Sequence, residues 1–159
     1  FDFRRPLVNM NPKSLLRHPL VQSNIEELSE GKFHELIGDN YAEPEKVKRI
    51  ILCSGKVYFD LLEYQQKNNR TDIALLRLEQ LYPFPMTQLN AQIAKYKGAE
   101  LMWVQEEPRN MGAWFYIWNL LGTKINKKVS RKSSASPATG FAKIHAKEQQ
   151  ELVEQAFAD

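Results

Sequence analysis

The fold class of this chain is decided by residues 47–53, which read Val47-Lys48-Arg49-Ile50-Ile51-Leu52-Cys53. The stretch is short, apolar and β-branched at its centre, which is typical of a strand buried inside a sheet. Ser54 and Gly55 end it, and residues 57–64 then carry apolar side chains that suit a helix ending near residues 68–69. A buried strand that leads directly into a helix is the repeating unit of an α/β fold.

The same order of strand and helix continues toward the C-terminus. We expect further strands at 72–78, 100–105 and 124–129, and further helices at 87–96, 113–121 and the C-terminal end, where Leu152, Val153, Ala156 and Phe157 are apolar. Strands that alternate with helices imply a parallel sheet covered on both faces through right-handed crossovers. We therefore expect a three-layer α/β/α domain, with the lysine-rich 124–129 strand at an edge of the sheet.

The N-terminal part has a different character. An extended stretch at 7–10 precedes a short helix that Asn11 and Pro12 are suited to begin. Residues 33–37 follow as a short extended piece, and a loop runs to residue 45. We expect residues 1–45 to be a lead-in segment and linker that packs on the domain, and residues 46–159 to be the domain. Phe1 is neither an initiator methionine nor part of a signal peptide, so we expect the chain to be part of a longer polypeptide.

Bulk composition excludes several classes of protein. The net charge of +3, from 22 basic and 19 acidic residues, is too balanced to indicate nucleic acid as a partner. One cysteine, Cys53, permits no internal disulfide and favours a reducing compartment. No apolar run approaches the roughly 20 residues that span a bilayer, so we expect no membrane contact. His18, His34 and His145 lack the spacing of a helical metal site, and we expect no metal in this chain.

The polar residues that follow the strands are the first candidate site. Ligands of such folds bind beyond the carboxyl ends of the strands, where this chain has Glu106 and Glu107 before Arg109 and Asn110. Adjacent residues on an extended segment point in opposite directions, so the two glutamates cannot form a facing acid/base pair. We favour a role at an active-site rim or domain contact over catalysis, and no catalytic residue is predicted.

Basic residues form the second candidate site. They crowd the N-terminal segment and the stretch before Ser133 and Ser134, where solvated surface is the simplest interpretation. The alternative is a site for a nucleotide, coenzyme A or an acidic partner. A Ser54-Gly55-Lys56 turn resembles a phosphate-binding turn, although a helix cap is favoured there. The candidate anion-binding residues are Arg4, Arg5, Lys13, Arg17, Lys56, Arg131 and Ser134.

Five blocks of sequence carry a family resemblance. They are PKSLLRHP (12–19), CSGKVY (53–58), RLEQLYPFP (77–85), QEEPRNMGAW (105–114) and SASPATG (134–140). In this order they resemble the C-terminal part of 2-oxoglutarate dehydrogenases, the thiamine-diphosphate-dependent decarboxylating component of a multienzyme complex. More distantly, the layout is similar to the C-terminal domain of transketolase-like enzymes. That similarity implies one antiparallel edge strand, which we expect at 124–129.

The resemblance implies a parent enzyme that oxidatively decarboxylates 2-oxoglutarate and passes the succinyl group to a lipoyl-acyltransferase. It implies a homodimer in which thiamine diphosphate and magnesium bind between two larger preceding domains, whose Gly-Asp-Gly…Asn signature is absent here. We expect this domain to complete the dimer and the active-site rim, to hold no cofactor, and to be inactive alone. The alternative is a regulatory module that binds acetyl-CoA or AMP. A bacterial cytoplasm is favoured over a mitochondrial matrix.

Two details give further expectations. Trp103, Trp114, Tyr116 and Trp118 are core residues by pattern, but a dimer requires that some apolar side chains remain on the surface. The family usually has glycine where this chain has Ser130. If that glycine supplies a positive φ, Ser130 should alter the local turn.

Overall fold

The computed structural model describes residues 4–6, 8–125 and 127–158 of the chain. Contacts within the chain divide it into two compact units, Phe1–Lys32 and Phe33–Asp159. Residues 33–45, which we expected in the lead-in segment, contain a strand that pairs inside the second unit.

The described residues of the first unit include two short helices. The 3-10 helix η1 covers Lys13–Arg17, and α1 covers Ile25–Ser29. Asn24 caps α1 through a capping box with Glu27. A short helix follows Asn11 and Pro12 as expected, but it is a 3-10 helix whose cap residue is Pro12 rather than Asn11, and no side-chain cap bond is made. Its extension is opposed by Pro19, because a residue that precedes proline disfavours the α conformation.

The second unit is built on a five-stranded sheet in the order β1-β3-β2-β4-β5. Its strands are β1 (Leu36–Ile37), β2 (Arg49–Cys53), β3 (Ile73–Leu78), β4 (Glu100–Pro108) and β5 (Lys127–Arg131). The expected single antiparallel edge strand is confirmed, but its predicted position is wrong. β1 is antiparallel to β3, whereas β5 lies parallel to β4. A helix intervenes between β4 and β5, and such a crossover returns the chain to the end of the sheet where a parallel strand begins.

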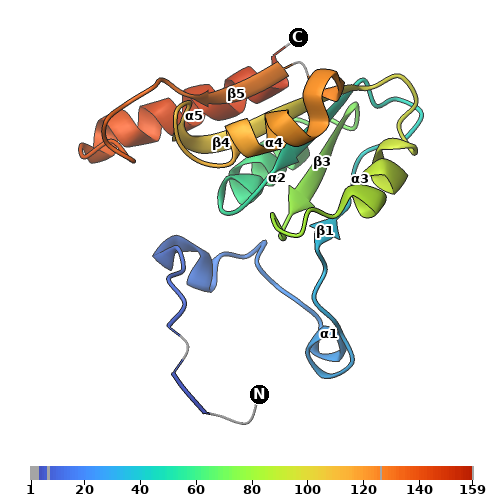
Figure 1. Ribbon diagram of the computed structural model, residues 1–159, viewed down its shortest axis with the longest axis horizontal. Helices are drawn as coiled ribbons and strands as arrows, with labels where there is room; N and C mark the ends of the chain where they lie inside the picture. Colours follow the sequence, from blue (N-terminus) through green and yellow to red (C-terminus); the bar gives the residue numbers. More distant parts are fainter. Residues whose placement is uncertain (1–3, 7, 126, 159) are drawn as a thin grey trace. The chain divides into compact units, whose positions relative to one another are not determined.

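Helices cover both faces of the sheet, as Figure 1 shows. α2 (Val57–Lys67) and α5 (Ala142–Phe157) pack on one face, while α3 (Met86–Ile93) and α4 (Trp114–Leu121) pack on the other. A short 3-10 turn, η2, follows α4 at Gly122–Lys124. The predicted three-layer α/β/α architecture is therefore confirmed.

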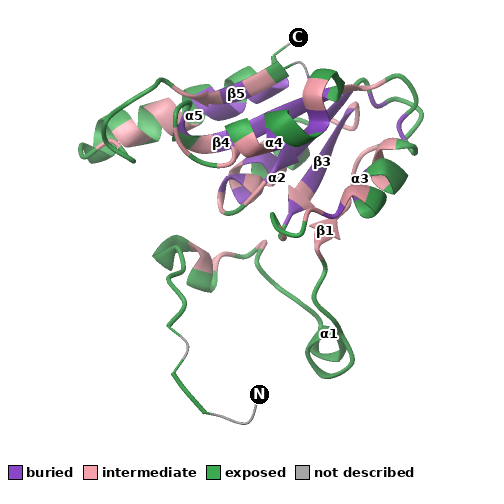
Figure 2. Cartoon of the chain, in the orientation of Figure 1, coloured by how far each residue is buried: buried purple, intermediate pink, exposed green. Residues whose placement is uncertain are grey.

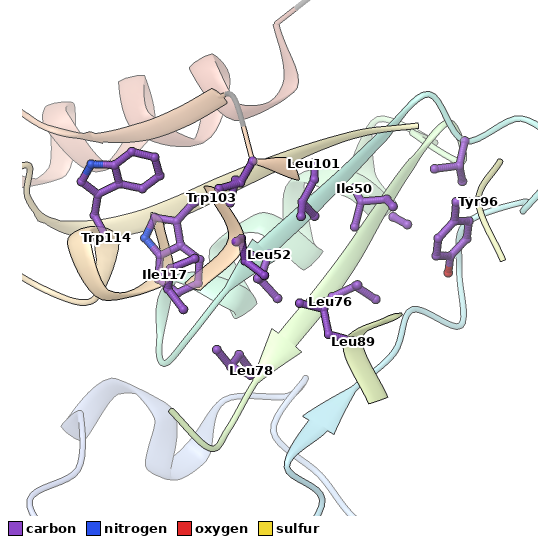
Figure 3. Packing of buried hydrophobic residues seen from close by; sticks show 14 residues of the cluster. Ile50, Leu52, Leu76, Leu78, Leu89, Tyr96, Leu101, Trp103, Trp114 and Ile117 are labelled. Carbon is purple, nitrogen blue, oxygen red and sulfur yellow. The ribbon is translucent and has the colours of Figure 1, made fainter. Parts of the chain in front are cut away.

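The central strand β2 explains the apolar stretch that indicated the fold. Its alternating side chains enter two cores: Ile50 and Leu52 face α3 and α4, and Ile51 and Cys53 face α2 and α5. Figure 3 shows the first core, in which Trp103 lies close to Ile117 of α4. Figure 2 shows that the central strands β2, β3 and β4 are the most deeply buried part of this unit. Burial raises the pKa of the Cys53 thiol to about 12, so this thiol stays protonated and inert at neutral pH.

One charged residue, Arg49, breaks the apolar run of β2. Its side chain is buried, and its Nε donates to the Glu100 carboxylate on β4. Its Nη1 donates to the backbone oxygens of Ala156, at 3.0 Å, and Ala158. Lys127 Nζ also pairs with Glu100, at 2.8 Å. Arg49 thus ties β2 to β4 and to the C-terminal end of α5.

The Glu100 carboxylate is expected to make the free energy of unfolding depend on pH in the acidic range. Burial works to raise the pKa of Glu100, but hydrogen bonds from Lys127 and Arg49 outweigh it and hold the pKa below the ordinary value of 4.5. A lowered pKa in the folded state means that the unfolded chain takes up the proton first. We expect the stability advantage of wild type over Glu100→Gln to be complete above pH 4.5 and to shrink as the pH falls through the lowered pKa. Urea unfolding from pH 3 to pH 7 measures this difference in stability. Glu63→Gln, on the exposed side of α2, is the control and should leave the fall in stability at low pH unchanged.

Candidate functional site

The carboxyl edge of the sheet carries the first candidate site. Here β4 is longer than predicted: it runs through Glu106 and Glu107 to Pro108, where we expected a loop. The extension follows a register shift between Val104 and Pro108, after which Pro108 pairs with Arg131 of β5. The backbone amide of Arg109 also donates to the Arg131 oxygen, at 2.9 Å. Pairing with β5 therefore keeps the glutamates in the strand.

Gln105, which was not among the predicted site residues, organises the turn that follows. Its buried side-chain oxygen accepts from Trp103 Nε1 at 2.8 Å and from the Trp114 amide at 3.0 Å. Its Nε2 donates to the Pro108 oxygen at 3.1 Å and to the Met111 oxygen at 2.7 Å. One side chain thus satisfies backbone groups on both sides of the turn. A polar residue on the same strand face as a core tryptophan, two residues away, is a signal that could have identified it.

Gly112 closes the same turn, and two features exclude a side chain there. Its φ is +68°, and an added Cβ would lie 2.9 Å from Gln105 Nε2. We expect Gly112→Ala to lower the free energy of unfolding by about 2 kcal/mol, from backbone strain together with disturbed Gln105 bonds.

Gly98→Ala is the matched control for Gly112→Ala, because Gly98 has a φ of +76° but open space around its Cβ position. It should cost only the backbone part, about 1 kcal/mol. Chemical denaturation of both variants separates the two contributions. Equal losses would show that the contact with Gln105 has no energetic weight.

Glu106 and Glu107 lie in different surroundings. Glu106 Oε2 is 3.0 Å from Lys56 Nζ and accepts from Gln149 Nε2 at 3.3 Å, while Glu107 is exposed. Lys56 also pairs with Asp60, at 3.1 Å. Burial opposes the charged form of Lys56, but the bonds and charges of Glu106 and Asp60 outweigh it and raise its pKa. Lys56, a candidate for anion binding, is therefore an ammonium held by two carboxylates of its own chain.

Arg131 joins this polar cluster from β5. Its Nη2 donates to Gln149 Oε1 at 2.8 Å, and its Nη1 lies 3.0 Å from His145 Nδ1. Gln149 in turn donates to Asp60 Oδ2 at 2.7 Å and contacts Glu106. Polar contacts therefore run without a break from Arg131 through Gln149 to the pair of Glu106 and Lys56. The residues at the two ends of this path, Arg131 and Lys56, lie far apart in the sequence.

A pocket of about 520 Å³ lies beside Arg131. The loop after β5 forms one wall, and α5 forms another. Asn110 holds this loop: its Nδ2 donates to the Ser134 oxygen at 2.9 Å, and its Oδ1 accepts from the Ser134 amide at 3.0 Å. The lining residues are Pro108, Ser130, Arg131, Lys132, Ser133, Ser134, Ser136, Ala138, Thr139, Gly140, Glu148, Glu151, Leu152 and Gln155.

The remaining candidates take different positions. Ser130 lies inside β5 and is not among the described residues with a positive φ, so the backbone at this position does not require glycine. Arg4, Arg5, Lys13 and Arg17 belong to the first unit, where all four are exposed. Arg131, Ser134 and Asn110 come together at the pocket, and Lys56 and Glu106 meet beside it.

Comparison with known proteins identifies the family. Residues 22–157 match the family model described as 2-oxoglutarate dehydrogenase C-terminal. The chain belongs to this family. It is 44% identical to the 2-oxoglutarate dehydrogenase E1 component of Haemophilus influenzae, over 98% of this chain and 17% of that protein. It is 46% identical to the oxoglutarate dehydrogenase of Buchnera aphidicola, over 97% of this chain and 18% of that protein. The E1 component of Azotobacter vinelandii is 43% identical, over 97% and 17%. The chain thus spans less than a fifth of the length of these curated relatives.

This member of the 2-oxoglutarate dehydrogenase C-terminal family carries an apolar surface outside its core. Phe115 and Trp118 on α4 are 56% and 52% exposed, and Tyr82 in the loop before α3 is 85% exposed. The Tyr116 hydroxyl donates to the Leu81 oxygen at 2.8 Å, which fixes this loop against α4. Figure 2 shows the exposed outer turns of α4. Trp103 and Trp114 are buried, so α4 presents aromatic side chains both to the core and to the surface.

Within residues 4–6, 8–125 and 127–158, no three His, Cys, Asp or Glu side chains come together in a way that could hold a metal ion. Every helix in the described part of the chain is too short or too polar to cross a bilayer.

Proposed function

We propose that this chain serves as the C-terminal domain of a 2-oxoglutarate dehydrogenase. The parent enzyme would oxidatively decarboxylate 2-oxoglutarate and transfer the succinyl group to a lipoyl-acyltransferase. The domain would complete a homodimer and support the active-site rim, and it would not catalyse the reaction alone. The family match and the names of the bacterial relatives support this proposal. A bacterial cytoplasm is the proposed location.

The exposed aromatic surface of α4 is the observation that carries the assembly role. Large apolar side chains that cluster on a surface are typical of sites covered by another protein surface. Phe115, Trp118 and Tyr82 form such a set, and the bond from Tyr116 to Leu81 joins the helix and the loop that carry them. The proposed occupants are the preceding domains of the same polypeptide or the second subunit of the homodimer.

The rim role rests on the turn after β4. Gln105 fixes this turn from the core, and Asn110 fixes it to the loop at Ser134. Arg109 and Glu107 project from a backbone that is held at both ends, and both side chains are exposed. A rigid turn with exposed charges suits a surface that meets a neighbouring domain or the entrance of an active site.

Thiamine diphosphate and magnesium would belong to preceding domains of the parent enzyme. When bound, thiamine diphosphate supplies the carbanion chemistry that decarboxylation of a 2-oxo acid requires. The residues described here do not offer a three-ligand cluster for its magnesium ion. We propose that those domains, rather than this chain, hold the cofactor.

Substitutions on α4 test the assembly role in the parent enzyme. We expect Trp118→Ser to weaken the contact that covers α4 by about 2 kcal/mol, because a half-exposed tryptophan is typical of an interface anchor. Sedimentation measures dimer dissociation, and hydrogen exchange compares α4 in the parent enzyme and in the isolated chain. Phe141→Ser, at an exposed aromatic before α5, is the matched control and should change neither. Equal exchange of α4 in both forms would contradict the proposal.

A second candidate function is favoured by the pocket beside Arg131. It combines Arg131, Lys132 and several serines with a volume that suits a small ligand. The domain would then be a regulatory module that binds an anionic effector such as acetyl-CoA or AMP. Calorimetry of this chain with acetyl-CoA, with AMP and with thiamine diphosphate–magnesium separates the two roles. Binding of an effector that weakens with added salt supports regulation, whereas turnover of 2-oxoglutarate by the isolated chain would contradict both roles.

A further inference from the structure

We propose that the Glu148 carboxylate occupies part of the pocket and pairs with Arg131 until an anionic ligand displaces it. This inference rests on the second candidate function, the binding of an anionic effector. It concerns how binding is controlled: the chain supplies its own competing anion, and the affinity of the pocket is set by that competition.

The position of Glu148 carries the proposal. Its Oε2 accepts a hydrogen bond from Thr139 Oγ1 at 2.6 Å and lies 3.6 Å from Arg131 Nη1. All three residues line the same pocket. Glu148 on α5 thus bridges the loop after β5 and the guanidinium at its base. A bound phosphate would make the same contacts, namely a bond from a hydroxyl and an ion pair with arginine.

Arg131 is a buried side chain that can still donate a further hydrogen bond. Its side chain is only 8% exposed, and its terminal nitrogens contact His145 and Gln149 on α5. Its Nε is buried and has no hydrogen-bond partner among the described residues. A buried guanidinium donor that is left unsatisfied costs free energy. An oxyanion that reaches Arg131 could satisfy this donor.

The charge balance of the pocket gives Glu148 its effect. The pocket is lined by two cations, Arg131 and Lys132, and by two carboxylates, Glu148 and Glu151. A site with this balance attracts a phosphate weakly while both carboxylates remain. Glu148 contacts Arg131, whereas Glu151 pairs with Lys147 at 3.7 Å. Glu148 should therefore compete directly, and Glu151 should act only through its more distant charge.

Glu148→Gln isolates the competing charge. The glutamine oxygen can still accept from Thr139, so the loop contact is kept while the negative charge is removed. Glu151→Gln makes the same change in net charge on the same pocket wall. The pair of variants separates direct competition for Arg131 from a general change in the electrostatic field.

The test is calorimetric titration of wild type, Glu148→Gln and Glu151→Gln with AMP, and separately with inorganic phosphate and adenosine. We expect Glu148→Gln to bind AMP about tenfold more tightly than wild type, and Glu151→Gln to stay within about twofold. Adenosine should not respond to either change. Tighter binding of phosphate as well would assign the gain to the phosphate group itself, as the proposal requires. Circular dichroism of each variant verifies that it is folded.

The outcomes distinguish this inference from the function on which it rests. If wild type binds AMP and Glu148→Gln binds it no more tightly than Glu151→Gln does, internal competition is overturned while the effector role stands. If neither wild type nor Glu148→Gln binds AMP or phosphate, the effector role fails and the inference fails with it. Binding by Glu148→Gln alone would be the strongest support, since the carboxylate would then close the pocket completely.

Discussion

Gln105→Leu is expected to lower the free energy of unfolding by about 4 kcal/mol. Leucine fills nearly the same buried volume but leaves the Trp103 indole and the Trp114 amide without their acceptor. It also removes the donor to the Pro108 and Met111 oxygens. Each buried polar group left without a partner costs about 1–3 kcal/mol, and several are affected at once. Urea denaturation monitored by tryptophan fluorescence measures the loss.

The control for Gln105→Leu is the same substitution at Gln88, which is exposed on α3. It should change stability by less than about 0.5 kcal/mol. Hydrogen exchange should show faster opening of residues 106–113 in the Gln105 variant. A loss below about 1 kcal/mol would mean that the turn satisfies its own backbone and that Gln105 does not organise the candidate rim.

Arg49→Met is expected to cost about 3 kcal/mol. Methionine keeps an apolar stem in the core but removes the partner of Glu100 and the donor to the C-terminal end of α5. Removing one member of a buried ion pair leaves the other without compensation, which typically costs about 3–5 kcal/mol. We expect the lower end of that range, because Lys127 still pairs with Glu100.

Lys46→Met tests whether charge loss alone explains the Arg49 effect. Lys46 pairs with Glu43 at 2.7 Å, but both side chains are largely exposed. An exposed pair contributes about 0–1 kcal/mol, so this variant should remain close to wild type. Because Arg49 also anchors the end of α5, hydrogen exchange should show fraying of that helix in Arg49→Met. Equal stability of the two variants would show that the buried pair contributes nothing measurable.

The candidate rim and the pocket share one framework. Gln105 holds the turn after β4 from the core side, and Asn110 attaches this turn to the loop that lines the pocket. Arg131 then joins the pocket to Glu106 through Gln149. A change at the pocket therefore has a continuous set of contacts to the carboxyl edge of the sheet. This arrangement is compatible with either proposed role and makes Glu148 the most direct place to separate them.

Sequence reasoning succeeded where the signal is local. The strands 47–53 and 72–78 and the helix 113–121 were predicted nearly at their observed bounds, because side-chain periodicity reports which faces of a segment are buried. It failed for the direction of β5 and the length of β4. Lysines indicate an edge strand in either direction, and the end of β4 depends on its pairing with Arg131, a residue far along the chain.

By itself, the sequence determined the α/β class, the buried central strand and the family, since each rests on the order and spacing of residues along the chain. Only the tertiary structure decided which polar residues meet. Lys56 with Glu106, Asn110 with Ser134, and Arg131 with Gln149 are each brought together from separate elements by the packing of the sheet and α5. Partners that are distant in sequence leave no periodic trace in it, because their contact is fixed by the arrangement of whole strands and helices rather than by local propensity.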